Sequence, residues 1–490
     1  MMMIGETLKQ HASLQGEKAA IRFKDVEITY EQFYHHIQRW KTKLHTILKV
    51  DRPKRVALYL HNEPLFLELF YAIISLGWTV VPLDYKWTTK EREHALSISN
   101  PNLVICHLKD IDRCQESAVT LTVLTVEELI QSKEVEKLSI QIDEEQPFYL
   151  GFTSGSNGRP KGFLRSHASW LESFKSCEDA FSYTKDDTIY APGSYVHSLS
   201  LFAAIHALHI GSTLWVTDLF CANEAAELIQ TGKINVMYVV PTMLEAIRRA
   251  LPAYSKAKVN MILSSGAKLT EESIRELRDY FPTTKFYEFY GASELSYVSF
   301  IDYQQHSNKI GSVGKAFPGV EIVIKGLNGE KIQSNEVGEV YVKSKQVFSQ
   351  YVDDEQKTKN VIQGDEATVS DIGYLDQDDF LYLIGRKGNL IITGGLNVFP
   401  EEIEQIVKQF PEIEEAALLG KNDNYWGEKL VLFVKWKGSQ NLYNVIEACR
   451  EYLSAYKCPK EVIELEVFPY TTSGKVNRER LQELLEEIHE

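Results

Sequence analysis

One loop of the sequence reads Thr153-Ser154-Gly155-Ser156-Asn157-Gly158-Arg159-Pro160-Lys161-Gly162. It follows the apolar, aromatic run Pro147-Phe148-Tyr149-Leu150-Gly151-Phe152, which predicts a buried strand. Glycines let backbone N–H groups approach a polyanion closely, because no Cβ stands in the way. The Ser and Thr hydroxyls add donors, and Lys161 adds a positive charge. The loop therefore predicts a phosphate-binding site, with a polar surface turn as the alternative.

This loop differs from the common nucleotide-binding loop, in which Gly-Lys-Ser/Thr follows four spacer residues. Here Pro160 precedes the lysine and Gly162 follows it, so no hydroxyl stands ready to hold magnesium directly after Lys161. The choice between a phosphate site and a surface turn therefore depends on the rest of the chain.

The totals bound the class of protein. At 490 residues the chain is too long for one ordinary core, so we expect two or more domains. No apolar run reaches the ~18 residues of a membrane span, and no secretory signal is visible at the N-terminus. The six scattered cysteines favour a reducing cytoplasm over a disulfide framework or a zinc site. The net charge of −15 disfavours nonspecific binding to nucleic acid or to an anionic membrane.

The first part of the chain alternates predicted strands and helices. Strands are expected at 56–60 and from 79, with a helix between them that starts near Pro64 and stops at Gly77. Asn62 is expected to cap this helix, because a short polar side chain suits that position. Strand, helix and strand at this spacing imply parallel pairing, and therefore a layered α/β domain.

Later strands end in turns that carry small or polar residues. Strands are expected at 236–240, 261–264 and 285–289. The second and third run into Ser265-Gly266-Ala267 and Tyr290-Gly291-Ala292-Ser293-Glu294. Ligands bind outside the carboxyl ends of strands in open α/β sheets, so both turns are candidate binding loops.

The pattern changes from about residue 310. Short strands at 320–324, 337–342 and 380–384 predict a small β-rich subdomain, and a compact α+β domain of about 100 residues follows it. The predicted division is an N-terminal domain at 1–385, a hinge at 386–389 and a C-terminal domain at 390–490. The expected fold class is α/β, with layered subdomains in the large N-terminal domain.

Four separated patches of the sequence share small, polar and basic residues. They are the loop at 153–162, the turn Tyr290 to Glu294, the run Ser370 to Leu375 continuing to Gly385-Arg386-Lys387, and Thr472-Ser473-Gly474-Lys475-Val476-Asn477-Arg478. In this order they resemble the adenylate-forming (AMP-binding) superfamily of acyl-CoA synthetases, peptide-synthetase adenylation domains and beetle luciferases. The resemblance spans about residues 15 to 485.

The resemblance implies an enzyme that joins a carboxylic acid to a thiol at the expense of ATP. The acid first takes AMP from ATP, with release of pyrophosphate, and the thiol of coenzyme A then attacks the acyl-adenylate. The first step brings two anions together, so it needs positive charge and preorganised donors. ATP, Mg²⁺ and coenzyme A are the implied cofactors.

The same resemblance assigns nucleotide-binding residues. The residues implied to bind the β- and γ-phosphates are Thr153, Ser154, Gly155, Ser156, Gly158 and Lys161. The adenine falls to Ser265, Gly266, Ala267, Glu288, Phe289 and Tyr290, and Gly291 completes this part of the site.

Four further residues take the rest of the nucleotide. Ser293 stands where the family usually has Thr and is expected to donate to the α-phosphate. Glu294 matches the family's magnesium-associated acid, and its hard oxygen suits that ion. Asp371 is expected to accept from the ribose hydroxyls, with Arg386 beside it.

Members of this family rotate a mobile C-terminal domain between the half-reactions. Lys475 is then expected to face the site during adenylation and to stabilise its transition state. The loop with Gly394 and Gly395 is expected to replace it and to shape the coenzyme A channel. The family's pivot is usually Asp or Lys, but here that position is Gly388, and Lys387 is a second candidate.

The acid depends on the residues around His197, which matches a position lining the family's acyl site and gating its thiol tunnel. Adenylation domains for α-amino acids carry an Asp near residues 195–198, and its absence argues against such a substrate. The helix that follows is apolar, with Leu199, Leu201, Phe202, Ala203 and Ala204. We therefore expect a medium- or long-chain fatty acid, with ordinary core packing as the alternative account of these residues.

Other assignments stay open. The acid is alternatively o-succinylbenzoate or another aromatic acid, the acceptor is alternatively a carrier-protein phosphopantetheine, and a luciferase-like oxygenase is remote. A nucleotide-binding regulator without catalysis is a different class, which the retention of Lys475 disfavours. The expected partners are small molecules and not nucleic acid, the expected location is the cytoplasm, and the expected state is a monomer or homodimer.

Overall fold

The computed structural model describes most of the chain. The chain divides into two compact units. The described residues are 3–48, 54–116, 121–133, 140–154, 160–252, 259–269, 271–326, 328–423, 425–438, 445–471 and 475–489. The first unit comprises Met1–Thr153, Arg159–Ile322 and Val342–Ala367, and the second comprises Ser154–Gly158, Val323–Tyr341 and Thr368–Glu490. The expected α/β fold class is confirmed.

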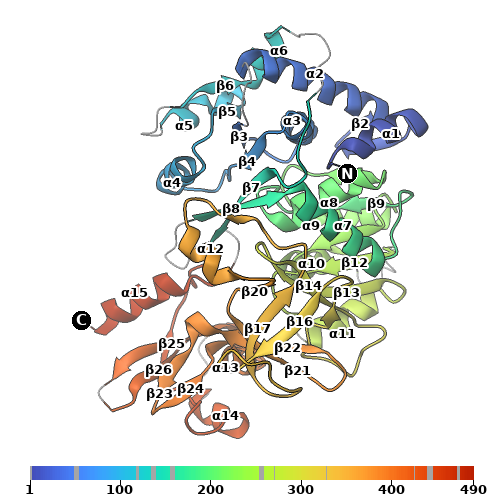
Figure 1. Cartoon of the computed structure of the whole chain (residues 1–490). Coiled ribbons are helices and arrows are strands. Elements are labelled where there is room, and N and C mark those ends of the chain that lie inside the picture. Colours follow the sequence, from blue (N-terminus) through green and yellow to red (C-terminus); the bar gives the residue numbers. More distant parts are fainter. Residues whose placement is uncertain are drawn as a thin grey trace. The chain divides into compact units, whose positions relative to one another are not determined.

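The first unit contains two sheets, one of which runs in the order β18-β8-β7-β4-β3-β5-β6 (Figure 1). Its strands are β18 (Gln350–Tyr351), β8 (Pro160–Ser166), β7 (Pro147–Ser154), β4 (Thr79–Pro82), β3 (Arg55–Tyr59), β5 (Leu103–Cys106) and β6 (Val123–Thr125). β3 pairs in parallel with both β4 and β5. The predicted strand–helix–strand layer is therefore confirmed, and the predicted phosphate loop joins β7 to β8.

The other sheet of this unit runs in the order β15-β14-β13-β12-β11-β9-β10-β1-β2. Its strands are β15 (Lys315–Ala316), β14 (Ser296–Asp302), β13 (Lys285–Ala292), β12 (Met261–Ser264), β11 (Val236–Val239), β9 (Thr188–Tyr190), β10 (Thr213–Val216), β1 (Ala19–Phe23) and β2 (Val26–Thr29). The parallel register of β11, β12 and β13 sets Val239, Ser264 and Glu288 level with one another. The turns that follow these strands therefore leave the same edge of the sheet.

Helices cover these sheets. They are α1 (Glu6–Leu14), α2 (Tyr30–Leu48), α3 (Pro64–Ile74), α4 (Thr89–Ser99), α5 (Ile111–Gln115), α6 (Val126–Gln131), α7 (His167–Ala180), α8 (Ser198–His209), α9 (Ala222–Gln230), α10 (Pro241–Ala250), α11 (Glu271–Tyr280) and α12 (Glu355–Val361). Of the helices that the structure describes, none is both long and apolar enough to cross a membrane.

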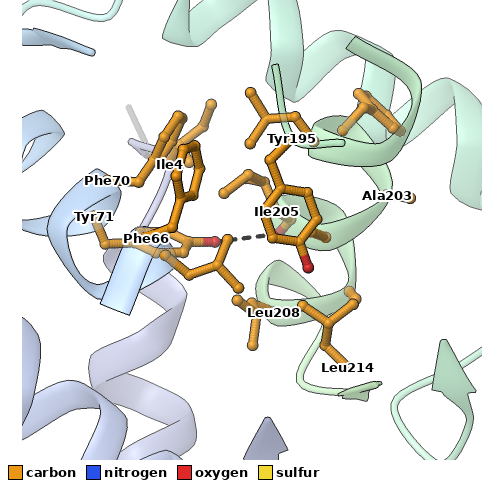
Figure 2. Close-up of a cluster of buried hydrophobic side chains, with 14 of the residues drawn as sticks. Ile4, Phe66, Phe70, Tyr71, Tyr195, Ala203, Ile205, Leu208 and Leu214 are labelled. Atoms are coloured by element: carbon orange, nitrogen blue, oxygen red, sulfur yellow. Dashed lines mark hydrogen bonds between the residues drawn. The ribbon is translucent and has the colours of Figure 1, made fainter. Parts of the chain in front are cut away.

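Helix α8 is apolar because it is buried on more than one side. The Tyr71 hydroxyl of α3 donates to the Ile205 carbonyl at 3.2 Å, within the cluster that Figure 2 shows between these helices. The Phe202 ring instead packs against Trp170 and Tyr297, with centroids 5.4 and 5.0 Å away. A helix that is hydrophobic all round belongs in a core. Core packing therefore accounts for the apolar residues of α8, and they give no independent support for a fatty acid.

The prediction that Asn62 caps the following helix is wrong. The N-cap of α3 is Glu63, with Pro64 at the first helical position. The buried Asn62 amide donates to the Gly193 carbonyl at 2.8 Å and accepts from the Tyr195 amide at 2.9 Å. The buried backbone groups of a distant loop need partners, so Asn62 fixes the loop before α8 instead.

The second unit contains short strands followed by an α+β region. The strands β16 (Glu321–Lys325), β17 (Gly338–Lys343), β21 (Asp371–Leu375) and β22 (Leu381–Arg386) confirm the predicted β-rich segment. Beyond them lies a sheet in the order β24-β23-β26-β25, with β27 also paired to β26. Its elements are β23 (Ile391–Thr393), β24 (Leu396–Val398), α13 (Pro400–Val407), β25 (Ile413–Asp423), β26 (Gly427–Trp436), α14 (Val445–Tyr452), β27 (Glu461–Glu464) and α15 (Arg478–His489).

The predicted hinge at 386–389 lies inside this second unit. Lys387–Asn389 form a short 3₁₀ turn between β22 and β23. The domain boundary and the pivot at this turn stay predictions.

Candidate active site

The carboxyl ends of β12 and β13 are held together by Ser265. Its hydroxyl donates to the Phe289 carbonyl at 2.8 Å, and its amide donates to the Val239 carbonyl at 3.3 Å. Gly266 follows with φ of 93°, a left-handed conformation that favours glycine. The structure therefore brings the predicted Ser265-Gly266-Ala267 turn next to the strand that carries the predicted adenine residues.

Two of the predicted adenine-binding residues on β13 have side chains that are buried and contact other residues of the protein. The buried Glu288 carboxylate accepts from the Leu269 amide at 3.1 Å and from the Tyr303 hydroxyl at 3.0 Å. The buried Phe289 ring packs against Tyr297 with centroids 4.9 Å apart. The backbones of both residues and the half-buried Tyr290 remain the candidates for bordering a nucleotide.

Glu288 predicts a pH dependence of stability. Burial raises its pKa to about 7, although the Leu269 amide, the Tyr303 hydroxyl and Lys268 oppose this shift. The folded state therefore holds the proton between the ordinary carboxyl pKa and about 7, so stability falls as pH rises through this window. Across this window the wild type is expected to lose about 3 kcal/mol of its free energy of unfolding, and Glu288→Gln should abolish this loss.

This expectation is checked by urea unfolding of the wild type and of Glu288→Gln between pH 5 and pH 8. The free energy of unfolding of the variant, relative to that of the wild type, should rise with pH and level off above about pH 7. A constant difference across this range would show that Glu288 does not titrate in the window.

The turn after β13 holds a carboxylate in a fixed place. Glu294 is buried, and its Oε1 accepts from the Tyr351 hydroxyl at 2.6 Å. The neighbouring Ser293 hydroxyl accepts from the Ser198 hydroxyl at 3.5 Å, so this turn lies beside the N-terminus of α8. Mg²⁺ is bound in proteins by one or two carboxylates together with substrate phosphates. A carboxylate that Tyr351 fixes by one oxygen fits that role.

His197 lies beside a buried acid that the sequence interpretation missed. His197 is the N-cap residue of α8, and its Nε2 lies 4.0 Å from Asp84 Oδ2. This oxygen is buried and has no hydrogen-bond partner among the residues that the structure describes. Asp84 follows the carboxyl end of β4, which is the signal that identifies it as a candidate.

The predicted phosphate loop is only partly described. Thr153 and Ser154 end β7, and Lys161 is half-buried near the start of β8. The predictions for Gly155, Ser156 and Gly158 lie outside the described residues, as does the 472–474 part of the last patch.

In the second unit, the predicted ribose residue Asp371 lies beside Arg386, as expected. Asp371 and Arg386 face each other across β21 and β22, and Arg386 Nε donates to Asp371 Oδ1 at 2.7 Å. Lys387 donates to Glu339 at 2.9 Å, and this hydrogen bond raises the pKa of Lys387. The structure therefore supports the predicted pairing of Asp371 with Arg386.

Lys475 lies beside an antiparallel bridge between Tyr470 and Val476 in this unit. Its carbonyl accepts from the Thr471 amide at 2.7 Å, and its side chain is exposed. Arg478, three residues on, donates to both Glu404 oxygens at 2.6 and 2.7 Å and to the Leu418 carbonyl at 2.9 Å. The missed residue Glu404 is buried, so an anchored ion pair fixes the chain next to Lys475.

The Gly394–Gly395 turn is also fixed within the second unit. Both glycines have positive φ, 57° and 78°, as the tight connection from β23 to β24 requires. The Gly394 amide donates to the Trp426 carbonyl at 2.7 Å, and the Trp426 ring lies 3.6 Å from where a Cβ of Gly394 would stand. A Cβ at this distance makes an ordinary van der Waals contact, so the positive φ of Gly394, and not the space beside the ring, favours glycine here.

Gly388 is exposed, and none of the described residues approaches within 4 Å of a Cβ placed on it. Gly388→Ala is therefore expected to be harmless. Proline fits the φ of a 3₁₀ turn but prevents its change. Gly388→Pro is expected to slow thioester formation about tenfold more than pyrophosphate exchange. Equal losses in the two half-reactions, measured against Gly388→Ala, would count against a pivot at this residue.

The fold matches that of solved adenylate-forming enzymes. The structure of o-succinylbenzoate CoA synthetase from Bacillus subtilis in complex with its acyl-adenylate intermediate aligns with a TM-score of 0.90. The alignment covers 98% of this chain and 99% of that chain, at 24% identity. Similarity at this level of identity establishes the fold, which is a large α/β N-terminal domain with a small C-terminal domain.

Sequence comparison establishes the family. The family model described as AMP-binding enzyme matches residues 8–352, and the AMP-binding enzyme C-terminal domain matches 402–475. The uncharacterized acyl–CoA ligase YhfT of Bacillus subtilis is 37% identical over 487 residues, which are 99% of each chain. A proposed long-chain fatty acid–CoA ligase, VraA of Staphylococcus haemolyticus, is 30% identical over 494 residues, covering 99% of this chain and 98% of its own. The chain belongs to the AMP-binding enzyme family, in its acyl-CoA ligase branch, and the predicted class of AMP-forming acid–thiol ligase is confirmed.

Proposed function

We propose that the protein activates a carboxylic acid with ATP as an acyl-adenylate, releases pyrophosphate and transfers the acyl group to coenzyme A. The observation that carries this proposal is the buried Glu294 carboxylate, which Tyr351 fixes beside Ser293 and the N-terminus of α8. A fixed hard anion next to hydroxyl donors suits a magnesium–polyphosphate substrate. Membership of the acyl-CoA ligase branch supports the thiol acceptor.

The described residues divide the work of the first half-reaction. Lys161 and Ser293 donate to phosphate oxygens, and Asp371 accepts from the ribose hydroxyls. Glu294 holds the Mg²⁺, which screens the phosphate charges when it is bound. Lys475 supplies the positive charge that brings the substrate carboxylate and the α-phosphate together, because two anions otherwise repel each other.

The second half-reaction needs a channel for a thin, flexible thiol. The Gly394–Gly395 turn offers backbone without side chains for this purpose, and Trp426 holds its shape. His197 and its neighbour Asp84 lie near the N-terminus of α8, where the acyl group is expected. The carrier-protein acceptor and the regulator without catalysis remain the alternatives to this proposal.

Two classes of acid remain equal candidates for the substrate. A medium- or long-chain fatty acid has the support of the relative named for such a substrate. An aromatic acid such as o-succinylbenzoate gains weight because core packing accounts for the apolar surface of α8. The solved structure named for that acid shares the fold with this chain.

The test is acid-dependent ATP–pyrophosphate exchange without coenzyme A, run over fatty, aromatic and amino acids. Exchange with one acid class would support adenylation and identify the substrate class. Adding either coenzyme A or a phosphopantetheinylated carrier protein then identifies the acceptor. A protein that binds ATP but exchanges with no acid of the panel would contradict the proposal.

A further inference from the structure

Arg165 is a buried cation that the proposed roles do not use. It lies on β8 with 3% of its surface exposed. Its Nη1 donates to the Ser293 carbonyl at 3.0 Å, its Nη2 to the Gln346 carbonyl at 2.7 Å and its Nε to the Ser169 hydroxyl at 3.2 Å. These acceptors are uncharged, although burial of a charge is costly without an opposite charge. Burial lowers the pKa of this arginine to about 9, against the attraction of Tyr149 and Glu294.

The two carbonyls belong to the two segments that enclose Glu294. Ser293 directly precedes this residue, and Gln346 begins the run that leads to Phe348 and Tyr351. The Phe348 amide donates to the Glu294 carbonyl at 2.7 Å, and the Tyr351 hydroxyl donates to its carboxylate at 2.6 Å. Beside these two direct hydrogen bonds, the guanidinium adds a further link between the turn that carries the carboxylate and the segment that holds it.

The planar fork of an arginine suits this task. It presents several N–H donors in a rigid arrangement, so one side chain fixes two carbonyls relative to each other. Lysine carries the same charge on a flexible stem and offers no such fork. An aliphatic side chain of similar length would fill the space but leave both carbonyls without this donor.

We propose that Arg165 is a positioning residue that holds the Ser293–Glu294 turn against the 346–351 segment and so sets the carboxylate for Mg²⁺·ATP. The inference deepens the proposed function and rests on it for the identity of the ligand. Outer-sphere partners of metal ligands act through orientation, and their loss weakens metal binding by 10–100-fold in typical cases, on the order of the effect expected here. Nothing in the proposal requires Arg165 itself to touch the nucleotide.

Three variants separate positioning from simple destabilisation. Arg165→Met removes the charge and the fork, and Arg165→Lys keeps the charge alone. Glu68→Gln is the matched control, because Glu68 is buried in the same unit and accepts from His36 and Trp40, both at 2.8 Å. It perturbs a buried polar cluster that has no part in the Glu294 turn.

The readout is thermal stabilisation by a fixed concentration of ATP over a magnesium titration, with pyrophosphate exchange measured in parallel. Arg165→Met is expected to raise the magnesium midpoint by about tenfold or more, with a smaller rise in Arg165→Lys and none in Glu68→Gln. The KM for the acid should not change. A midpoint in Arg165→Met equal to that of Glu68→Gln would overturn the proposal and leave Arg165 as a fold-stabilising residue.

The magnesium titration also separates this inference from the proposed function. A wild type that exchanges no pyrophosphate but shows magnesium-dependent stabilisation by ATP would contradict the acid activation, and the midpoints would still decide the role of Arg165. A wild type that ATP does not stabilise at any magnesium concentration would overturn both.

Discussion

Lys475→Ala is expected to lower acid-dependent pyrophosphate exchange by about 10²–10³-fold, the loss typical of removing one preorganised donor from a charge-developing transition state. The Lys475 side chain is exposed, so its truncation removes little buried surface. Folding should therefore be unaffected, and the loss should fall on kcat because the charge acts where the carboxylate meets the α-phosphate.

The second half-reaction is the internal control for this prediction. Thioester formation from a chemically prepared acyl-adenylate and coenzyme A should stay within about threefold of the wild type in Lys475→Ala, since the Gly394–Gly395 loop is expected to replace Lys475 at the site in that step. Lys437→Ala, which removes another exposed lysine of the same unit, should change neither rate. Unchanged exchange in Lys475→Ala would exclude this residue from catalysis of the first half-reaction.

The elements of the fold were predictable where a local pattern determines them. The strands 236–239, 261–264 and 285–292 are short, apolar and bounded by turn residues, and the structure has them close to the expected positions. Parallel pairing followed from the spacing of the strands at 56–60 and from 79, because parallel neighbours need a helical connection, and the same open α/β architecture was expected for these later strands. The turns at their carboxyl ends were therefore identifiable as binding loops before their geometry was known.

The residues that stabilise these loops were not predictable. Asn62 lies just before a helix and is a residue type common at N-caps, but its amide donates to the carbonyl of Gly193, 131 residues further along the chain. Arg165 and Asp84 belong to charged residue types, which are usually exposed. Both are buried next to candidate site residues. Their roles depend on which segments the tertiary fold brings together, and the local hydrophobic periodicity of the sequence does not predict this.

Helix α8 shows a different limit of sequence reasoning. Its apolar residues have the same composition whether they line an acyl pocket or fill a core, and the periodicity is the same in both cases. Only the packing of Phe202 against Trp170 and of Ile205 near Tyr71 shows that the core needs them. The substrate class was therefore beyond the sequence, although the chemistry of activation was not.

Arg478→Met is expected to destabilise the C-terminal part of the second unit by about 3–5 kcal/mol, the usual cost of leaving one partner of a buried ion pair uncompensated. Glu404 is 8% exposed and accepts from Arg478 at 2.6 and 2.7 Å and from the Leu418 amide at 2.6 Å. The variant should also lose pyrophosphate exchange, because Arg478 anchors the chain next to Lys475. Hydrogen exchange of β25 and β26 reports the local stability.

The pH dependence distinguishes a stranded charge from lost packing. Burial already raises the pKa of Glu404, and Arg478 opposes this shift, so removing the arginine raises that pKa further. The folded variant then binds a proton that the unfolded chain releases, and its stability should increase as pH falls from 8 towards 5. Arg480→Met, on the same helix but with its exposed partners Glu483 and Glu487, should show little change.

The double variant Glu404→Leu/Arg478→Met completes this test. Replacing both charges by apolar side chains removes the uncompensated carboxylate, so most of the stability lost in Arg478→Met should return. The rate of pyrophosphate exchange should recover with it if the ion pair acts only by fixing the chain next to Lys475. Recovery of stability without recovery of pyrophosphate exchange would mean that Arg478 sets the direction of Lys475 and does more than stabilise the chain next to it.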